Sequence, residues 1–325
     1  MNQGVPKSDD VSLEHFPVTF FATVMGLAGM TLALHVVEAR FGWGSGASTL
    51  SLWVTIVDFI VLAAVYLLKA FRYPHAVVAE WHHPVKMAFF PAISISLLLI
   101  ATALRDQMPD LALGIWCVGA IAQGGLTLAV ISGWIGRRPF QPMQISPAWF
   151  IPAVGNVIVP VAGVPFGFVE LSWLFFSTGV LFWIVLLTLV MNRLIFHDPL
   201  PGRLLPTLGV LIAPPAVAFL AWLQLNGGEI DAFARILYNA SLVFAAIVAL
   251  QAPGFAKLPF VLSWWALSFP VAGLTLATMH FGRLTGSSTH DALGLGFWAV
   301  LLLIMAGLIV RTILAKVRGE LCRPE

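Results

Sequence analysis

The chain is poor in charged residues, which make up 10% of its 325 amino acids. A soluble domain has about 25% charged residues. Hydrophobic residues account for 59% of the sequence, and the mean hydropathy is +0.94. This composition excludes an ordinary soluble protein. The net charge of +2 gives no reason to expect a nucleic-acid partner.

Cysteine and catalytic motifs are also scarce. The two cysteines, Cys117 and Cys322, lie in a predicted helix and in the C-terminal tail, so no disulfide framework is expected. The sequence contains no Walker loop, no His-Glu-x-x-His pair and no dinucleotide fingerprint. Glu80, His82 and His83 form one titratable cluster, but adjacent residues do not share one face of a helix. A loop or helix cap is therefore favoured there, and we expect no enzyme, no cofactor and no metal.

What the sequence does contain is long apolar segments, each near the ~20 residues that cross a membrane as a helix. They number ten: Pro17–His35, Thr49–Leu68, Pro84–Leu104, Leu111–Trp134, Pro147–Val164, Leu171–Asn192, Pro206–Leu225, Asp231–Leu250, Pro259–His280 and Ala292–Leu314. The prediction is an all-α membrane protein with ten transmembrane helices. Its membrane domain covers 16–315, with short tails over 1–15 and 316–325.

Lysine and arginine predict the orientation of these segments. With ten spans, both termini and the loops leading into each odd-numbered segment lie on one side. That side carries 13 of the 17 basic residues, and the other carries Arg40, Arg105, Arg235 and Arg283. Because basic loops stay in the cytoplasm, we expect both termini to be cytoplasmic.

Proline alternates between the segments: 11 of the 21 prolines lie in odd-numbered segments and none in even-numbered ones. Every odd segment opens with proline. Four carry further prolines, among them Pro91, Pro152, Pro214 and Pro270, and the first has Gly26 instead. A proline inside a helix removes a hydrogen bond and bends the helix, and the freed carbonyl needs protein or water nearby. The odd segments are thus expected to line a wet interior, and the even segments to face lipid.

The five opening prolines are spaced by 67, 63, 59 and 53 residues, and each interval holds one odd and one even segment. This repeat predicts five helical hairpins, which could close into a ring around a central pore. The alternative is a compact bundle in which proline only shapes the helices, since proline is common in membrane helices.

The odd segments carry mild polar groups and no ring of acidic residues. Cation channels usually have such a ring, and proton-driven pumps usually bury a carboxylate or histidine relay. A weakly polar pore, helped by the dipoles of bent helices, suits anions better than cations.

Two residues are weighed individually. Asp58 lies mid-way along the second segment, where a carboxylate is costly and is a functional candidate, for example as the carrier of a coupled proton. Because that segment is even-numbered, a hydrogen-bonded Asp58 at a helix or subunit contact is favoured. Phe269 precedes Pro270 on an odd segment, and an aromatic plug at a bend can block a narrow pore. Ordinary packing is the alternative.

Several short motifs follow one another along nearly the whole chain. The motifs are Phe16-Pro17, Glu80-Trp81-His82-His83-Pro84-Val85, Ser146-Pro147 with Pro152-Ala153-Val154, Leu211-Ile212-Ala213-Pro214, Asn226-Gly227-Gly228-Glu229 and Trp265-Ala266-Leu267-Ser268-Phe269-Pro270. With the ten-helix plan, they resemble the tellurite-resistance/dicarboxylate transporter family, which includes bacterial TehA and the plant guard-cell slow anion channels.

The resemblance implies a homotrimer with one pore in each subunit, in a bacterial inner membrane. It implies that kinked odd helices line the pore and that Phe269 closes it near its middle. A passive channel for chloride- or nitrate-type anions is the first expectation. The alternative is a proton-coupled exporter or transporter of dicarboxylate, sulfite or tellurite-related anions, with Asp58 as the titrating residue.

Overall fold

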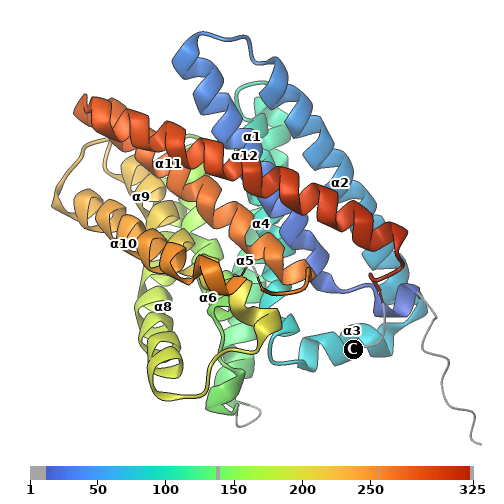
Figure 1. The fold of residues 1–325 in the computed structure, drawn as a ribbon. Helices are drawn as coiled ribbons and strands as arrows, with labels where there is room; N and C mark the ends of the chain where they lie inside the picture. Colours follow the sequence, from blue (N-terminus) through green and yellow to red (C-terminus); the bar gives the residue numbers. More distant parts are fainter. Residues whose placement is uncertain (1–11, 137–139, 256, 323–325) are drawn as a thin grey trace, which may run out of the picture.

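A computed structural model describes residues 12–136, 140–255 and 257–322 (Figure 1). All regular structure in these ranges is helical. Most of the predicted 1–15 tail, the end of the 316–325 tail, and the basic pair Arg137 and Arg138 lie outside the described residues. The α-helices are α1 (Phe21–Phe41), α2 (Gly46–Arg72), α3 (Pro74–His82), α4 (Pro91–Leu104), α5 (Pro109–Gly136), α6 (Phe150–Val154), α7 (Val159–Gly163), α8 (Val169–Phe196), α9 (Ala213–Leu225), α10 (Ala232–Phe255), α11 (Ser268–Thr285) and α12 (Ser288–Val317).

Nine helical stretches in the described ranges are long and apolar enough to cross a membrane. They match nine of the ten predicted segments. The fifth predicted segment, Pro147–Val164, corresponds to a shorter apolar stretch, Pro147–Gly163, which is broken into α6, α7 and two 3-10 turns. The prediction of a tenth full-length helix is therefore replaced by a short, interrupted one.

Burial separates the stretches into an inner and an outer set. We compare the most apolar 18 residues of each stretch. Between 67% and 78% of them are buried in the four long proline-led stretches, against 22% to 39% in the five others. The exposed faces of the outer set carry large apolar side chains such as Ile121, Leu128 and Leu303. Apolar side chains on an outer face suit a lipid environment.

Proline marks where the inner stretches change from a 3-10 helix to an α-helix. Pro91 is the first residue of α4, after the 3-10 turn Lys86–Phe89. Pro214 and Pro270 lie in the first turns of α9 and α11, after the 3-10 stretches Gly202–Ile212 and Leu262–Leu267. The first turn tolerates proline because its N–H groups lack α-helical partners.

Two outer helices extend beyond the predicted segments and include a proline there, so the alternation of proline between inner and outer helices is not strict. The fourth outer stretch, α10, continues to Phe255 and includes Pro253 near its end, and α5 begins at Pro109. Both prolines lie at helix ends, where they leave the apolar middle of the helix unbroken.

Each inner stretch packs against the outer helix that follows it, so α1 contacts α2, α4 contacts α5, and α11 contacts α12. Among the inner stretches, α1 contacts α4 and α11, and α9 contacts α7 and α11. The α4 helix also contacts α7.

The cap of α10 shows how a polar side chain orders one helix end. Asp231 accepts hydrogen bonds from the backbone N–H of Ala234 (2.7 Å) and from Nε1 of Trp222 (3.0 Å). The Ala234 N–H, followed by the smaller contribution of Trp222, holds the pKa of the Asp231 carboxyl below its usual value. This cap fixes the turn between α9 and α10.

Candidate functional site

A small apolar chamber lies in the middle of the bundle, with a volume of about 40 Å³. All five proline-led stretches contribute to it, and every described residue that lines it comes from them. The lining residues are Ala22, Met25, Phe89, Ile95, Phe150, Ile151, Val154, Gly155, Ile158, Val210, Ala213, Trp265, Ala266, Phe269 and Pro270. None of them is charged.

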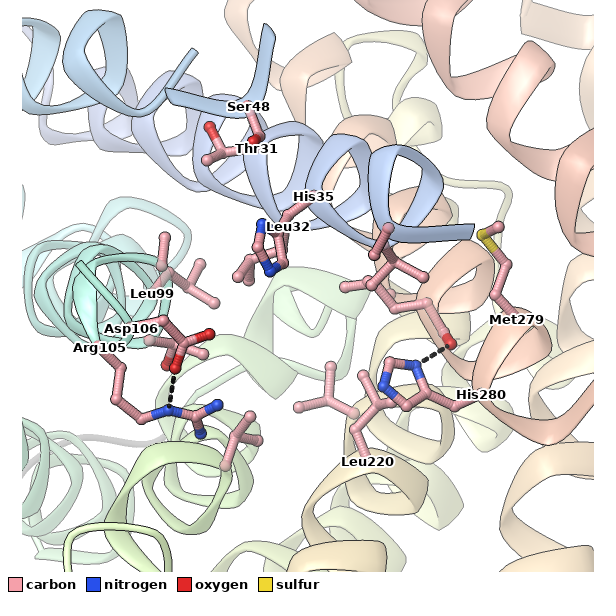
Figure 2. A pocket seen from close by; sticks show the side chains of 18 of the residues that line it. Thr31, Leu32, His35, Ser48, Leu99, Arg105, Asp106, Leu220, Met279 and His280 are labelled. Atoms are coloured by element: carbon pink, nitrogen blue, oxygen red, sulfur yellow. Dashed lines mark hydrogen bonds and ion pairs between the residues drawn. The ribbon is translucent and has the colours of Figure 1, made fainter. Parts of the chain in front are cut away.

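A larger cavity of about 600 Å³, the distal cavity, lies at the end of the bundle where α1 meets α2 (Figure 2). Phe269 and Ile158 line both this cavity and the central chamber. The distal cavity is apolar near Phe269 and polar toward its mouth, where Arg40, Arg105 and Arg283 lie.

A third cavity of about 880 Å³, the proximal cavity, lies near the two ends of the described chain and α3. Lys69, Lys86 and Arg203 are among its lining residues. Phe89 lines both the proximal cavity and the central chamber. The three cavities therefore adjoin in order, and Phe89 and Phe269 belong to the walls between them.

Phe269 is 9% exposed and follows Ser268, the first residue of α11. The neighbouring α1 helix approaches α11 closely at Gly26, where an added Cβ would lie 2.3 Å from Ser268 Oγ. Gly26 lies within α1, which is uninterrupted at this point. Because Gly26 has no side chain, α1 can pack closely against Ser268, the residue before Phe269. Among the prolines, Pro270 lines the central chamber. Pro152 and Pro214 directly follow the lining residues Ile151 and Ala213, and Pro91 lies two residues after the lining residue Phe89.

The break at Pro152 is held by buried polar side chains. The carbonyl oxygen of Pro152 accepts hydrogen bonds from Gln123 Nε2 (3.0 Å), Thr127 Oγ1 (2.9 Å) and Asn156 Nδ2 (3.1 Å). Ser94 Oγ donates to Gln123 Oε1 at 2.7 Å. These side chains are at most 2% exposed. Gln123 on α5 therefore links two inner stretches, at a place where backbone groups need partners.

Replacing Gln123 by leucine is expected to lower the stability of the protein by about 1–3 kcal/mol, because the change leaves buried polar groups without partners. Thermal unfolding of the purified protein in detergent measures the effect. Gln107→Leu is the matched control, because Gln107 is exposed and its side chain makes one long hydrogen bond, to Thr49 (3.3 Å). Equal unfolding temperatures for the two variants would contradict the structural role of Gln123.

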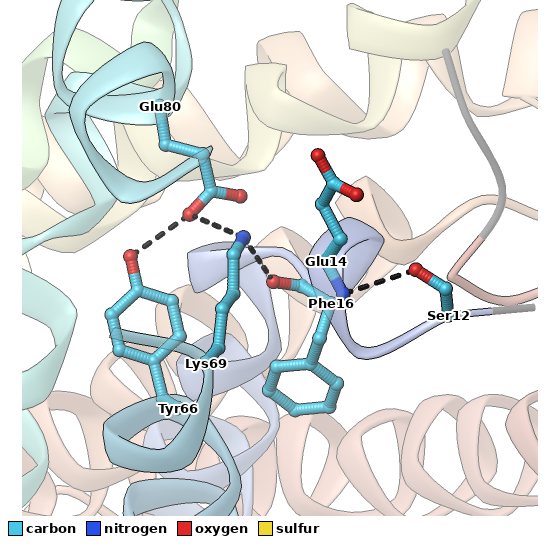
Figure 3. Close-up of polar contacts among 6 residues, drawn as sticks. All are labelled: Ser12, Glu14, Phe16, Tyr66, Lys69 and Glu80. Carbon is cyan, nitrogen blue, oxygen red and sulfur yellow. Dashed lines mark hydrogen bonds and ion pairs between the residues drawn. The ribbon is translucent and has the colours of Figure 1, made fainter. Parts of the chain in front are cut away.

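A buried ion pair lies at the edge of the proximal cavity (Figure 3). Lys69 Nζ lies 3.2 Å from Glu80 Oε2, and the two side chains are 1% and 7% exposed. Lys69 also donates to the carbonyl oxygen of Phe16 (2.8 Å), and the Tyr66 hydroxyl donates to Glu80 (2.8 Å). This cluster joins α2 and α3 to the residue that precedes the first inner stretch.

The histidines beside Glu80 have backbone partners. Nδ1 of His82 lies 2.7 Å from the carbonyl oxygen of Val78, and Nδ1 of His83 accepts from the N–H groups of Val85 and Lys86, each at 3.2 Å. His83 thus caps the turn that follows α3. A loop or a helix cap was predicted for this cluster. Glu80 and His82 instead lie in α3, and His83 is the C-cap residue of that helix.

Asp58 lies on the outer helix α2 and lines none of the three cavities. Its Oδ2 accepts a hydrogen bond from the hydroxyl of Thr23 on α1 at 2.8 Å. The residue therefore joins an outer helix to an inner one.

Sequence reasoning missed Gln123, the Lys69–Glu80 pair and the histidines of the distal cavity, His35 and His280. Gln123 is a lone polar residue on an outer helix, and Lys69 and Glu80 lie in separate elements. Both histidines are the last residues of predicted segments, a position that signalled only a helix end.

Comparison with known proteins places this arrangement in a family. A family model described as "Voltage-dependent anion channel" matches residues 15–313. The S-type anion channel SLAH3 of Arabidopsis thaliana is 28% identical over 81% of this chain and 42% of its own length. The tellurite resistance protein TehA homolog of Haemophilus influenzae is 27% identical over 82% of this chain and 81% of its own.

An uncharacterized transporter of Methanocaldococcus jannaschii is 26% identical, over 96% of this chain and 98% of its own length. The predicted resemblance is confirmed by these matches, and together with the apolar helices they identify a membrane protein. The chain belongs to the voltage-dependent anion channel family.

Proposed function

We propose that the protein is a gated passive anion channel, whose pore runs from the proximal cavity through the central chamber to the distal cavity. The observation that carries the proposal is the central chamber, because all five proline-led stretches line it and a larger cavity adjoins it on each side. The contacts that run from α1 to α4, α7, α9, α11 and back to α1 support a ring of five helical hairpins around this axis.

The narrowness of the chamber supports a closed pore. A space of about 40 Å³ between apolar and aromatic side chains offers none of the polar partners that hold water in place. Hydrophobic constrictions close channels by excluding water. Rotation of the Phe269 ring toward the distal cavity opens the path in this proposal.

The electrostatics of the path support anions. The chamber carries no charged side chain, so no carboxylate repels an anion there. The first turns of α1, α9 and α11 contribute Ala22, Ala213 and Phe269 to its wall. The N-terminal end of a helix is the positive end of its dipole and favours negative charge.

Planar-bilayer recording of the purified protein in a chloride gradient tests the conducted charge. The zero-current potential is expected to follow the chloride gradient, and to follow nitrate when nitrate replaces chloride on one side. A zero-current potential that follows the cation gradient, or proton-dependent substrate uptake without current, would overturn the proposal.

We expect Asp58→Asn to leave anion current and its dependence on pH unchanged, because Asp58 lines none of the three cavities and an asparagine can keep the bond from Thr23. Flux into liposomes at two pH values measures this. Loss of a pH-dependent uptake in Asp58→Asn would favour the alternative, a proton-coupled transporter of dicarboxylate, sulfite or tellurite-related anions. Thr178→Val on the outer helix α8 is a control for changes on the lipid-facing side.

We further propose a homotrimer in a bacterial inner membrane, with both termini in the cytoplasm and the distal cavity open to the outside. The orientation is supported by the distribution of basic residues in the sequence, because 13 of the 17 lie on the side of the termini and only four on the distal side. Light scattering of the detergent complex tests the subunit number, and a cysteine-labelling experiment on intact cells tests the orientation.

A further inference from the structure

One face of α11 runs from Phe269 to the mouth of the distal cavity. Phe269, Gly273, Leu276, His280 and Arg283 all line this cavity, at spacings of four, three, four and three residues. Such spacings place side chains on one face of a helix. The face changes from apolar beside Phe269 to titratable at His280 and permanently cationic at Arg283.

His280 presents one ring nitrogen to the cavity (Figure 2). Its Nδ1 lies 2.8 Å from the carbonyl oxygen of Leu276, one turn earlier. In neutral His280, Nδ1–H donates to that carbonyl, and Nε2 is a hydrogen-bond acceptor. Protonation turns Nε2 into a donor and adds a positive charge, so it makes His280 a ligand for an anion.

The charged groups that face this histidine come from three neighbouring helices and from α11 itself. The α1 helix contributes His35 and Arg40, Arg105 and Asp106 follow α4, and α12 contributes Asp291; α9 contributes no titratable residue to the cavity. Arg40 pairs with Asp291 and Arg105 with Asp106, each at 3.2 Å. The side chain of Arg283 makes no hydrogen bond or ion pair with the described residues.

The fixed charges of the cavity therefore favour an anion even before any histidine is protonated. Three arginines against two aspartates leave one positive charge, which belongs to Arg283. Each protonated histidine adds another. The cavity volume of about 600 Å³ leaves room for a small anion with part of its hydration shell.

We propose that the distal cavity is a proton-dependent binding site for a halide- or nitrate-sized anion, with His280 as its titrating ligand and Arg283 as the unpaired cation at its mouth. The direction of its effect on current rests on the proposed channel function, whereas the binding itself does not. In the channel, acid on the distal side fills this site and raises the supply of anions to Phe269.

Chloride NMR line broadening on the purified full-length protein in detergent tests the site without requiring conduction. Wild-type binding is expected to strengthen as the pH falls from about 8 to about 5, the range in which histidines titrate in proteins. His280→Gln is expected to remove most of this pH dependence and to bind chloride at least threefold more weakly at the acid end. A threefold change in affinity corresponds to a shift of roughly half a unit in the histidine pKa when chloride binds.

Two further variants keep the test decisive. Arg283→Gln, at an exposed position, is expected to weaken binding at every pH while the pH dependence remains. His197→Gln is the matched control, because His197 is exposed and lines none of the three cavities. A folded His280→Gln protein with wild-type pH dependence, or a wild type that binds no chloride at any pH, overturns the site.

The outcomes separate this site from the channel proposal. Chloride binding that depends on His280, with no current in any variant, leaves the site standing and defeats the channel. Anion current without binding that depends on His280 leaves the channel standing and defeats the site.

Discussion

Replacing Phe269 by alanine is expected to raise anion conductance at least tenfold. The Phe269 ring belongs to the wall shared by the central chamber and the distal cavity, so its loss joins the two spaces. Opening an apolar constriction to water lowers the barrier for an ion, and a reduction of only about 1.4 kcal/mol gives a tenfold faster passage. Voltage-clamped bilayers or oocytes with chloride, and then nitrate, measure the conductance.

The same variant is expected to fold well. A buried phenylalanine replaced by alanine typically costs about 3–5 kcal/mol. Because Phe269 lines cavities on two sides, we expect its loss to lie at the low end of that range. Phe175→Ala is the matched control: Phe175 is a half-buried residue on α8 that lines none of the three cavities. Unchanged conductance in folded Phe269→Ala protein, or an equal rise in Phe175→Ala, would defeat the gate assignment.

The inner and outer sets of helices were predictable because one physical rule acts on every span. A helix that faces lipid must satisfy its own backbone, so its apolar middle excludes proline. The prolines at 91, 214 and 270 therefore predicted burial, and the inner stretches that contain them are the buried ones. The sequence did not indicate that these prolines mark a change from a 3-10 to an α-helix, since that depends on the neighbouring helices.

The fifth stretch shows where a pattern of single residues is insufficient. Its hydropathy predicted a full span over Pro147–Val164, but Pro152 and Pro160 divide it into short helices. The carbonyl at Pro152 is satisfied by Gln123 and Thr127, which lie on α5, outside that stretch. A broken helix is stable only with such partners, and contacts between distant segments are not visible in one sequence.

The candidate site was predictable only in part. Phe269 was singled out by Pro270 and by the family motif around it, and its role as a gate remains a prediction. Phe89, which borders the chamber on the proximal side, carried no comparable signal among the 24 phenylalanines. A lining position depends on how five stretches meet, and local spacing does not determine that.

Replacing Lys69 by methionine is expected to destabilise the protein by about 3–5 kcal/mol, because it leaves the carboxylate of Glu80 buried without its counter-charge. The Glu80 side chain is 7% exposed, and among the described residues its carboxylate keeps only the hydroxyl of Tyr66, at 2.8 Å, as a side-chain donor. The carbonyl oxygen of Phe16 also loses its donor. Thermal or denaturant unfolding in detergent measures the loss.

The double variant Lys69→Met/Glu80→Met distinguishes a costly orphan charge from a general packing defect. Removing both charges is often neutral when apolar side chains of similar size replace them. The double variant is therefore expected to be more stable than Lys69→Met alone, with a residual loss of about 1–2 kcal/mol from the unpaired Tyr66 hydroxyl and Phe16 carbonyl. The exposed pair Arg105–Asp106 is the matched control, and breaking it is expected to cost less than about 1 kcal/mol. The losses of stability in the single variants Lys69→Met and Glu80→Met are compared with the loss in the double variant. If the two single losses add up strictly to the double loss, the two charges do not interact, and the link from α2 and α3 to the first inner stretch depends on other contacts.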